Sequence, residues 1–543
     1  MGKEFRQDLK ALLHSKVYVI SAAVTAVLSY GYLWMHPVVN VDDTSMIRYF
    51  YEGLAPQVGR CTLFLLNKVI PIARFGPLVT DFLGVVLMAG GASVFCILLK
   101  RLTQDRLHAA FYPVFTCLML SYPMIFEVYT YYLHNGVGLA YLLTMLALYR
   151  LTTGKKGWKP LFVSSVLLAA AISCYESFAA VYLLGLFLAA MAGMAFTEQK
   201  PAFREYAGAV LYGAAALLMG MVIRTVVCRL LLLILGLEPV MRSVGGSIGW
   251  IVSGEAPQKL FAMAKSFARY YVLNAVANPA IGILLAAEIL LVGLTVWYAV
   301  RTKKKLLLLN GLAVLLTPWL LSFVQGTMVY YRSMQVLPVF TAFALALLAH
   351  ELLTAGGKWM RRAAFLLIGL VWFCQVSELN HWFYVDHLIY EEDVRRCAAL
   401  AVDLERQTSP GKPVVFLGKR KESGVAQEYA YVRKGSTAYR FLSSVDRFFG
   451  ENGAEEEKRY AIVQNPVWYP MFDWAVDAFD EPGTELIAFF HMHGYPLLTP
   501  TQAMKEEALV LGADLPAWPQ EGSIVEREDY IIVKLGPFET LSP

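Results

Sequence analysis

The sequence predicts an α-helical polytopic membrane protein with about eleven transmembrane helices and a small α/β domain at its C-terminal end. The composition is 57% hydrophobic and 16% charged, whereas soluble domains carry about 25% charged residues. The mean hydropathy is +0.51. Long apolar runs recur as far as residue 379 and then stop, and charge rises beyond that point. We therefore divide the chain into a membrane domain, residues 1–380, and a C-terminal domain, residues 381–543.

The membrane domain contains eleven apolar runs that approach the length of a bilayer crossing, about 20 residues. They are residues 17–35, 77–99, 108–126, 133–151, 161–175, 178–196, 207–234, 276–300, 306–324, 333–353 and 362–379. The run at 161–175 is short, and only SCYESF separates it from the next one. The first run lacks a small-residue cleavage site, so we interpret it as a retained anchor and not a cleaved signal peptide.

The loops between these runs predict the orientation, because Lys and Arg favour cytoplasmic loops. Basic clusters lie at residues 1–10, 100–106, 154–159, 198–204, 301–305 and 357–362. With eleven helices, all six clusters fall on one side. We expect the N-terminus to be cytoplasmic and everything after residue 380 to be extracytoplasmic. The net charge of +5 is confined to short loops, which argues against a nucleic-acid partner.

The seven cysteines do not form a pattern typical of a disulfide framework or a zinc site. Most lie within apolar runs, among them Cys96, Cys117, Cys228 and Cys374. We interpret them as small core hydrophobes.

Two adjacent acids, Asp42 and Asp43, follow the first apolar run in VNVDDTSMIRYF. The predicted orientation places them on the outer face. One alternative is that Asp43 caps the helix that begins near Thr44, since Asp is a favoured N-cap residue. Because neighbouring residues do not share a helix face, the two acids have separate roles.

Other polar residues are predicted on the same face, at the ends of the apolar runs. They are Arg48, Glu52, Arg60, Glu127, Tyr131, His134, Asn135, Tyr175, Glu176, Arg242, Gln325, Tyr330, Tyr331 and Arg332. Ionisable groups at membrane depth usually pair or line a water-filled cavity. The convergence of acids and arginines predicts one polar chamber that opens outward.

Simpler interpretations remain open for several of these residues. Arg48 and Glu52 are four apart and fit a solvated surface pair, Arg60 fits a headgroup contact, and His134 fits an interfacial position. Arg224 and Arg229, inside the seventh run, have no assignment. Segments 44–54, 60–75 and 256–276 are amphipathic or mix apolar residues with cations, which indicates helices in the plane of the interface.

The C-terminal domain has its own pattern. KPVVFLGK (412–419), RYAIVQN (459–465) and YIIVKLG (530–536) predict short strands, and residues 394–407 predict an amphipathic helix. The histidines of HMHG (491–494) lack the company of a structural zinc site. We expect a structural or acceptor-handling domain.

Several short motifs, in this order, resemble one known family. They are VDDTSMIRYFYEG followed by VGR (58–60), CYES around Tyr175, YYRSMQVLPVF (330–340), NHWFYVDHLIYEEDVRR (380–396) and HGYP (493–496). Together the motifs resemble the Gtr type II family, the bacterial multi-spanning glucosyltransferases of the O-antigen-modifying bacteriophage type. The chain departs from the family pattern at Glu176, where we expect Gln after Tyr.

The resemblance implies a GT-C glycosyltransferase in the inner membrane of a bacterium. It implies a polyprenyl-phosphate hexose, with glucose as the sugar, as donor. It also implies an outer-face glycan, teichoic acid or lipid-linked sugar as acceptor, with a flippase and a donor synthase as partners. A transporter or flippase is the alternative function, but such proteins are typified by inverted repeats and midplane sites, and the sequence shows no repeat.

Sugar transfer predicts a role for each candidate residue. A carboxylate takes the acceptor's proton, for which we choose Asp42, with Asp43 as the cap or the acceptor-positioning group. Arginine stabilises the departing phosphate, for which we choose Arg332 with Arg60 as helper. We expect sugar or acceptor contacts, or contacts to the arginines, from Glu127, Tyr131, His134, Tyr175, Glu176 and Tyr331. Direct attack by the acceptor inverts the anomeric centre.

The adjacent acids Asp42 and Asp43 are also compatible with a Mg or Mn ion, although further ligands for such an ion are not evident in the sequence.

Overall fold

The computed structural model describes residues 2–40, 43–44, 53–129, 131, 134–198, 200–240, 250–251, 254–420, 424–448, 470–474 and 484–538. The chain forms two compact units. Unit 1 consists of residues 1–35, 50–382 and 437–452, and unit 2 of residues 36–49, 383–436 and 453–543. The division near residue 382 falls inside a helix, and a short segment after the first apolar run belongs to the second unit.

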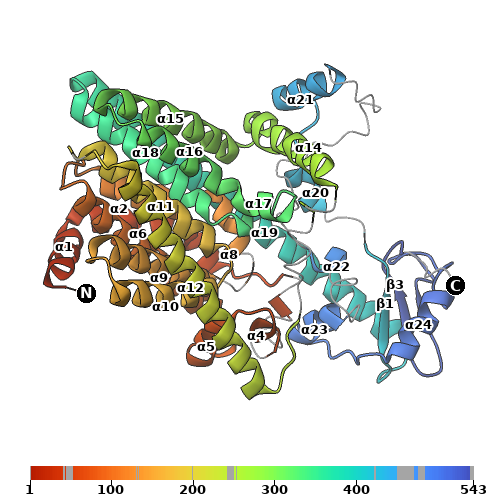
Figure 1. The fold of residues 1–543 in the computed structure, drawn as a ribbon. Coiled ribbons are helices and arrows are strands. Elements are labelled where there is room, and N and C mark those ends of the chain that lie inside the picture. The colour runs from red at the N-terminus through yellow and green to blue at the C-terminus, as the bar shows by residue number, and fades with distance from the viewer. Residues whose placement is uncertain are drawn as a thin grey trace. The chain divides into compact units, whose positions relative to one another are not determined.

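Unit 1 is a helical bundle (Figure 1). Its α-helices are α1 (Lys3–His14), α2 (Lys16–Met35), α4 (Ala55–Gln57), α5 (Cys61–Val69), α6 (Ile72–Leu102), α7 (Phe111–Leu120), α8 (Phe126–Tyr129), α9 (His134–Thr153), α10 (Trp158–Ile172), α11 (Phe178–Phe196), α12 (Phe203–Leu235), α14 (Ala256–Phe267), α15 (Pro279–Thr302), α16 (Leu306–Leu316), α17 (Leu320–Gln325), α18 (Val336–Ala355), the first half of α19 (Lys358–Gln407) and α21 (Thr437–Phe448). Short 3-10 or π turns connect some of them: η2 (Pro123–Ile125), η3 (Ala268–Val272), η4 (Leu273–Val276), η5 (Thr317–Trp319) and η6 (Tyr331–Ser333).

Each predicted apolar run is helical, and the chain is a polytopic helical membrane protein. Within the described residues, nine helices are long and apolar enough to span a membrane. The run at 108–126 is a pair, α7 followed by Pro123–Tyr129, bent by 42°; Pro123 stands at the first position of the second segment, where a missing N–H is tolerated. The run at 161–175 becomes α10, which has 15 residues. Among the described residues, length alone therefore gives nine spans, or ten if the bent pair is one span, where the sequence predicts about eleven.

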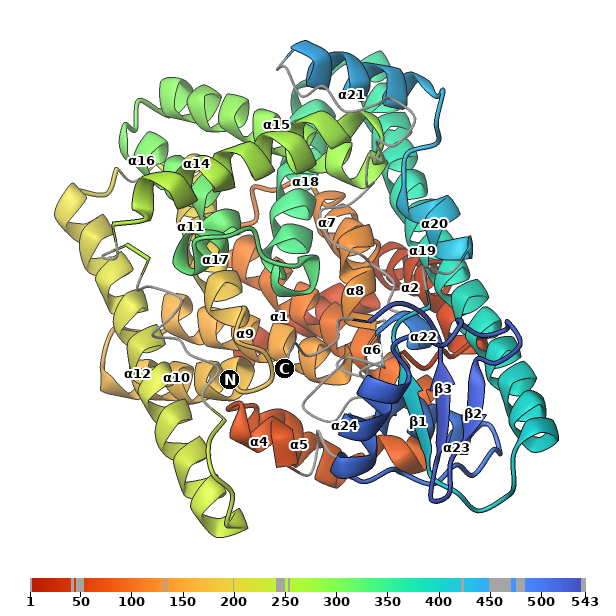
Figure 2. The same ribbon diagram turned by 90° about the vertical axis from the view of Figure 1, so that its right-hand side faces the viewer.

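Burial separates the helices of the bundle into central and peripheral ones. In the apolar stretch of α18, 83% of the residues are buried. This helix packs against α7, α11 and α15 (Figure 2). The stretches of α2, α12 and α19 are the least buried, and their outward faces carry large apolar side chains such as Leu218, Val222 and Leu366. Such faces are compatible only with lipid or another apolar surface.

Small residues let α6 and α9 approach closely. A Cβ added to Gly138 would collide with the carbonyl oxygen of Gly84, and one added to Gly91 would lie 2.9 Å from the backbone carbon of Tyr141. Close backbone approach at small residues is a common basis of helix association in membranes, where apolar burial gives little driving force.

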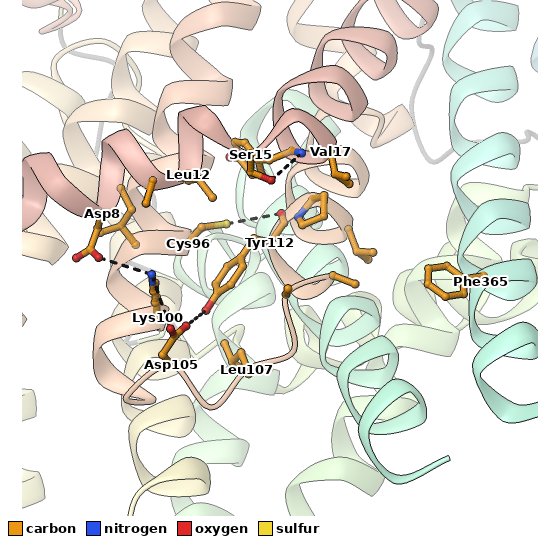
Figure 3. A pocket seen from close by; sticks show the side chains of 17 residues that line it. Asp8, Leu12, Ser15, Val17, Cys96, Lys100, Asp105, Leu107, Tyr112 and Phe365 are labelled. Carbon is orange, nitrogen blue, oxygen red and sulfur yellow. Dashed lines mark hydrogen bonds and ion pairs between the residues drawn. The ribbon is translucent and has the colours of Figure 1, made fainter. Parts of the chain in front are cut away.

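The amphipathic helix α1 was not among our predicted elements. It packs against the end of α6, where Arg101 donates to Glu4 at 2.7 Å and to Asp8 at 2.6 Å. These pairs adjoin a cavity of about 730 Å³, in which Lys100 lies between Asp8 and Asp105 (Figure 3). The predicted basic clusters at 1–10 and 100–106 thus contact each other through interspersed acids.

Unit 2 contains the second half of α19 and a small sheet. The strands are β1 (Val414–Leu417), β2 (Ile524–Glu526) and β3 (Ile531–Lys534), in the order β1-β3-β2. β3 is parallel to β1, with Val415 opposite Ile532, and antiparallel to β2. The helices are α20 (Gly424–Ala430), α22 (Met471–Trp474), α23 (Thr484–Met492) and α24 (Gln502–Leu511).

The sheet matches two of the three predicted strands, and their alternate residues build its core. Val415, Leu417 and Ile532 pack with Ala508 of α24. The predicted strand at 459–465 lies outside the described residues. The predicted helix at 394–407 is not a separate element, because α19 runs unbroken for 50 residues, about 75 Å at 1.5 Å per residue.

Candidate active site

Arg332 and the buried Glu127 form an ion pair in unit 1. Arg332 lies in η6, just before α18, and Glu127 lies in α8. The backbone N–H of Arg332 donates to Oε2 of Glu127 at 2.8 Å, and its Nη1 donates to Oε1 at 3.1 Å. Glu127 is buried, and the guanidinium retains partial exposure. The carboxylate therefore holds both the backbone and the side chain of the arginine in place.

Tyrosine rings surround this guanidinium. Nη1 of Arg332 donates to the hydroxyl of Tyr131 at 3.3 Å, and the cation lies 5.2 Å from the ring of Tyr131 and 4.6 Å from that of Tyr330. Gln335 donates to the carbonyl of Arg332 at 2.8 Å, and Tyr141 contacts Gln335. A guanidinium fixed by a carboxylate and packed on aromatic rings has the chemistry of an anion-binding group.

Tyr331 packs in an aromatic cluster. Its ring contacts Tyr271 at 6.0 Å, and Tyr271 stacks edge-on against Trp319 at 4.7 Å. Tyr331 is buried. Its ring packs against that of Tyr271, and sugar binding by Tyr331 stays a prediction.

Arg60, Tyr175 and Glu176 form a second cluster in unit 1. Arg60, just before α5, lies 4.8 Å above the ring of Tyr175, and its Nε is 3.6 Å from Oε2 of Glu176. Arg224 of α12 also reaches Glu176, donating from Nη2 to Oε1 at 3.0 Å. The position at which the chain departs from the family pattern thus carries a carboxylate shared by two arginines.

The sequence alone assigns no role to Arg224. The signal it does contain is the position of this arginine inside an apolar run. An arginine inside an apolar run is costly unless it finds a partner. Only the tertiary structure identifies that partner, because Glu176 is 48 residues away.

Gly59 and a disulfide complete the second cluster. Gly59 has a φ of +80°, and an added Cβ would lie 2.6 Å from Nη2 of Arg224. Glycine adopts this backbone without strain, which explains the glycine of VGR.

Cys61 and Cys228 form a disulfide with a Cα–Cα distance of 5.7 Å. The interpretation of Cys228 as a core hydrophobe is therefore wrong, because folding brings it beside a cysteine 167 residues away.

Asp43 belongs to unit 2 and is buried. Its Oδ2 accepts a hydrogen bond from the backbone N–H of Asn40 at 2.8 Å, and Nδ2 of Asn40 donates to Asp386 of α19 at 3.4 Å. Thr44 donates to Glu485 of α23. Asp43 thus closes a local turn with the upstream residue Asn40. The predicted cap on a helix after Thr44 falls on residues outside the described set and stays a prediction. Its neighbour Asp42 lies outside the described residues, as do Arg48 and Glu52.

The remaining predicted groups lie elsewhere or are undescribed. His134 begins α9, but its side chain is outside the described set, and Arg242 is not described. In unit 2, His493 lies against Phe489 and Tyr390 at ring distances of 4.5 and 5.9 Å, and burial lowers its pKa.

Two cavities of unit 1, of about 730 and 800 Å³, are lined by none of the predicted site residues. Among described side chains, no three His, Cys, Asp or Glu residues are grouped as metal ligands.

Comparison with known proteins decides the family. The family model described as glucosyl transferase GtrII matches residues 31–349, more than half of the chain. The chain belongs to this family. A comparison with curated proteins finds no match. The GtrII assignment makes the protein a membrane glycosyltransferase, as the resemblance implied, and the matched segment includes both arginine clusters and both acids.

Proposed function

We propose that the protein transfers glucose from a polyprenyl-phosphate donor to a cell-surface glycan or lipid-linked acceptor, on the outer face of a bacterial inner membrane. The observation that carries this proposal is the GtrII match over residues 31–349. The two arginine clusters support it, because guanidinium groups form charge-assisted, often bidentate hydrogen bonds to phosphate.

The transfer is a single displacement at the anomeric carbon. The acceptor hydroxyl attacks that carbon, its proton passes to the carboxylate of Asp42, and the bond from the anomeric carbon to the phosphate oxygen breaks. Negative charge then grows on the leaving phosphate, and Arg332 stabilises it because Glu127 fixes the guanidinium beforehand. Attack opposite the leaving group inverts the anomeric centre.

The orientation of the chain is part of the proposal. The six basic clusters favour a cytoplasmic N-terminus and an extracytoplasmic unit 2. The Cys61–Cys228 disulfide supports this orientation, because disulfides persist in the periplasm and not in the cytosol. The second cluster then faces the compartment in which surface glycans are assembled.

Partners and cofactors follow from the same chemistry. A synthase and a flippase must supply the lipid-linked sugar at the outer face. Asp42 and Asp43 are the residues that would hold a Mg or Mn ion, and the ion would neutralise phosphate charge. We assign no step of the reaction to such an ion.

The test uses the full-length protein in lipid nanodiscs with a panel of polyprenyl-phosphate sugars and cell-surface glycan acceptors. We expect transfer of a single glucose from the glucose-bearing donor. Asp42→Asn should lower kcat by about 10²–10⁴-fold, since it removes a general base. Asp43→Asn should act mainly on stability, because its carboxylate holds the turn at Asn40.

Absence of transfer from every polyprenyl-phosphate sugar would reject the donor class. In cells, deletion of the gene and the Asp42→Asn variant should both remove one hexose from the surface glycan. An unchanged glycan combined with altered solute uptake would favour the transporter alternative.

A further inference from the structure

Arg224 stands near one boundary of the hydrocarbon layer if α12 crosses the membrane. It is 21 residues after Phe203, the first residue of α12, or about 32 Å along the axis at 1.5 Å per residue. The hydrocarbon core is about 30 Å thick. The phosphate of a membrane lipid lies at this depth.

The donor groups of Arg224 are only partly used by the protein. Nε donates to the carbonyl of Gly59 at 3.3 Å, and Nη2 donates to Glu176 at 3.0 Å. In the described part of the chain, Nη1 of Arg224 makes no hydrogen bond, and the side chain is 21% exposed. Arginine presents its N–H groups as a fork that matches phosphate oxygens, so Nη1 is suited to an incoming ligand.

The disulfide fixes the second cluster in advance. Cys61 directly follows Arg60, and Cys228 lies one helical turn after Arg224, so the bond links the two backbone segments whose arginines both contact Glu176. α5 and α12 lie side by side at this point (Figure 1). Groups already held in the binding geometry lose little conformational entropy when the ligand arrives.

The outer surface of α12 offers a path for a hydrocarbon chain. Large apolar side chains are exposed along the helix on both sides of Arg224, including Leu218, Met221, Val222, Val226 and Val227. A lipid chain lying along this surface would carry its phosphate to the level of Arg224.

We propose that Arg60 and Arg224, held together by the Cys61–Cys228 disulfide, capture the phosphate of the lipid-linked sugar donor, while its isoprenoid chain lies along α12. This inference rests on the proposed function. The capture site acts on binding, whereas Arg332 acts on the charge that develops during transfer.

The first test measures binding of polyprenyl phosphate, without a sugar, to the full-length protein in neutral phosphatidylcholine nanodiscs by native mass spectrometry. Loss of one charge-assisted hydrogen bond should raise Kd at least about tenfold in Arg224→Gln. Arg229→Gln is the matched control: it removes a cation of the same helix one turn later, and its side chain is exposed. Its Kd should equal that of the wild type.

Kinetics distinguish this proposal from the proposed function. With the glucose-bearing donor, Arg224→Gln should raise the donor KM by a similar factor and change kcat less than threefold, the signature of lost ground-state binding. Wild-type transfer with an unchanged KM and Kd in Arg224→Gln would overturn the capture site alone. Absence of wild-type transfer would overturn the proposed function, and the binding assay would still decide the capture site.

The disulfide is tested by a double-mutant cycle. Cys61→Ser with Cys228→Ser should raise Kd, and adding Arg224→Gln should then have less than its full effect, because contacting groups are not additive. Cys374→Ser, at a free cysteine, is the control, and non-reducing peptide mapping verifies the bond. Full additivity, or equal losses in Arg229→Gln, would overturn the proposal.

An ordinary phospholipid headgroup presents the same phosphate chemistry. If the site binds such a headgroup, the effect of Arg224→Gln on donor KM will appear only when phosphatidylglycerol is added to the nanodiscs. That outcome would also overturn donor capture.

Discussion

At the scale of single residues, each described arginine of the site is defined by the carboxylate it contacts. Glu127 uses both oxygens for Arg332, and Glu176 is shared by Arg60 and Arg224. Both carboxylates orient guanidinium groups, although Glu127 is buried and Glu176 is partly exposed. Removing Glu127 would leave the Arg332 cation without its buried partner, which is destabilising.

Replacing Arg332 with lysine should separate charge from geometry. Lysine keeps the cation but loses the planar fork and the stacking on Tyr131 and Tyr330. We expect kcat to fall by about 10²–10³-fold, the loss seen when one preorganised donor to a developing oxyanion is removed. Initial-rate kinetics with saturating donor measure it.

Arg204→Lys, at an exposed arginine at the start of α12, is the control for that substitution and should leave kcat unchanged. An Arg332→Lys enzyme that is folded by size-exclusion chromatography and within threefold of wild-type kcat would refute the role of Arg332.

At the scale of elements, close helix contacts define the frame of the site. The contact of Gly138 with Gly84 sets the distance between α9 and α6, and α9 begins at His134, three residues after Tyr131. A wider spacing here would displace the segment that contacts Arg332.

Gly138→Ala should therefore destabilise the bundle. The added methyl group meets the backbone of α6, which cannot move aside like a flexible side chain, and such overpacking costs about 1–3 kcal/mol. The thermal unfolding midpoint of the purified protein should fall by several degrees. Gly193→Ala in α11 is the matched control, because open space surrounds that position, and alanine there should be neutral or stabilising by up to about 1 kcal/mol. Equal midpoints for the two variants would contradict the close contact.

At the scale of the whole molecule, topology determines which compartment each cluster faces. We expect Lys155→Cys, in the basic loop at 154–159, to be protected from a membrane-impermeant maleimide in intact cells, and Glu506→Cys on α24 to be labelled. Both side chains are exposed, so burial does not explain a difference. The background for both variants is the chain with its five free cysteines replaced by serine.

The reverse labelling pattern would place the basic clusters outside and the disulfide in the cytosol. It would thus refute both the orientation and the outer-face reaction. Labelling of both positions would indicate one span more or fewer between them.

The sequence by itself determined the membrane class, the positions of the apolar helices and two strands of the small sheet, because these follow from local hydropathy and periodicity. It also marked Arg60, Glu127, Tyr175, Glu176 and Arg332 as polar residues in apolar surroundings. Only the tertiary structure decided the partners: Glu127 with Arg332 across 205 residues, Glu176 with Arg224, and Cys61 with Cys228. Pairings of this kind depend on which helix ends meet after packing, and no local pattern encodes that.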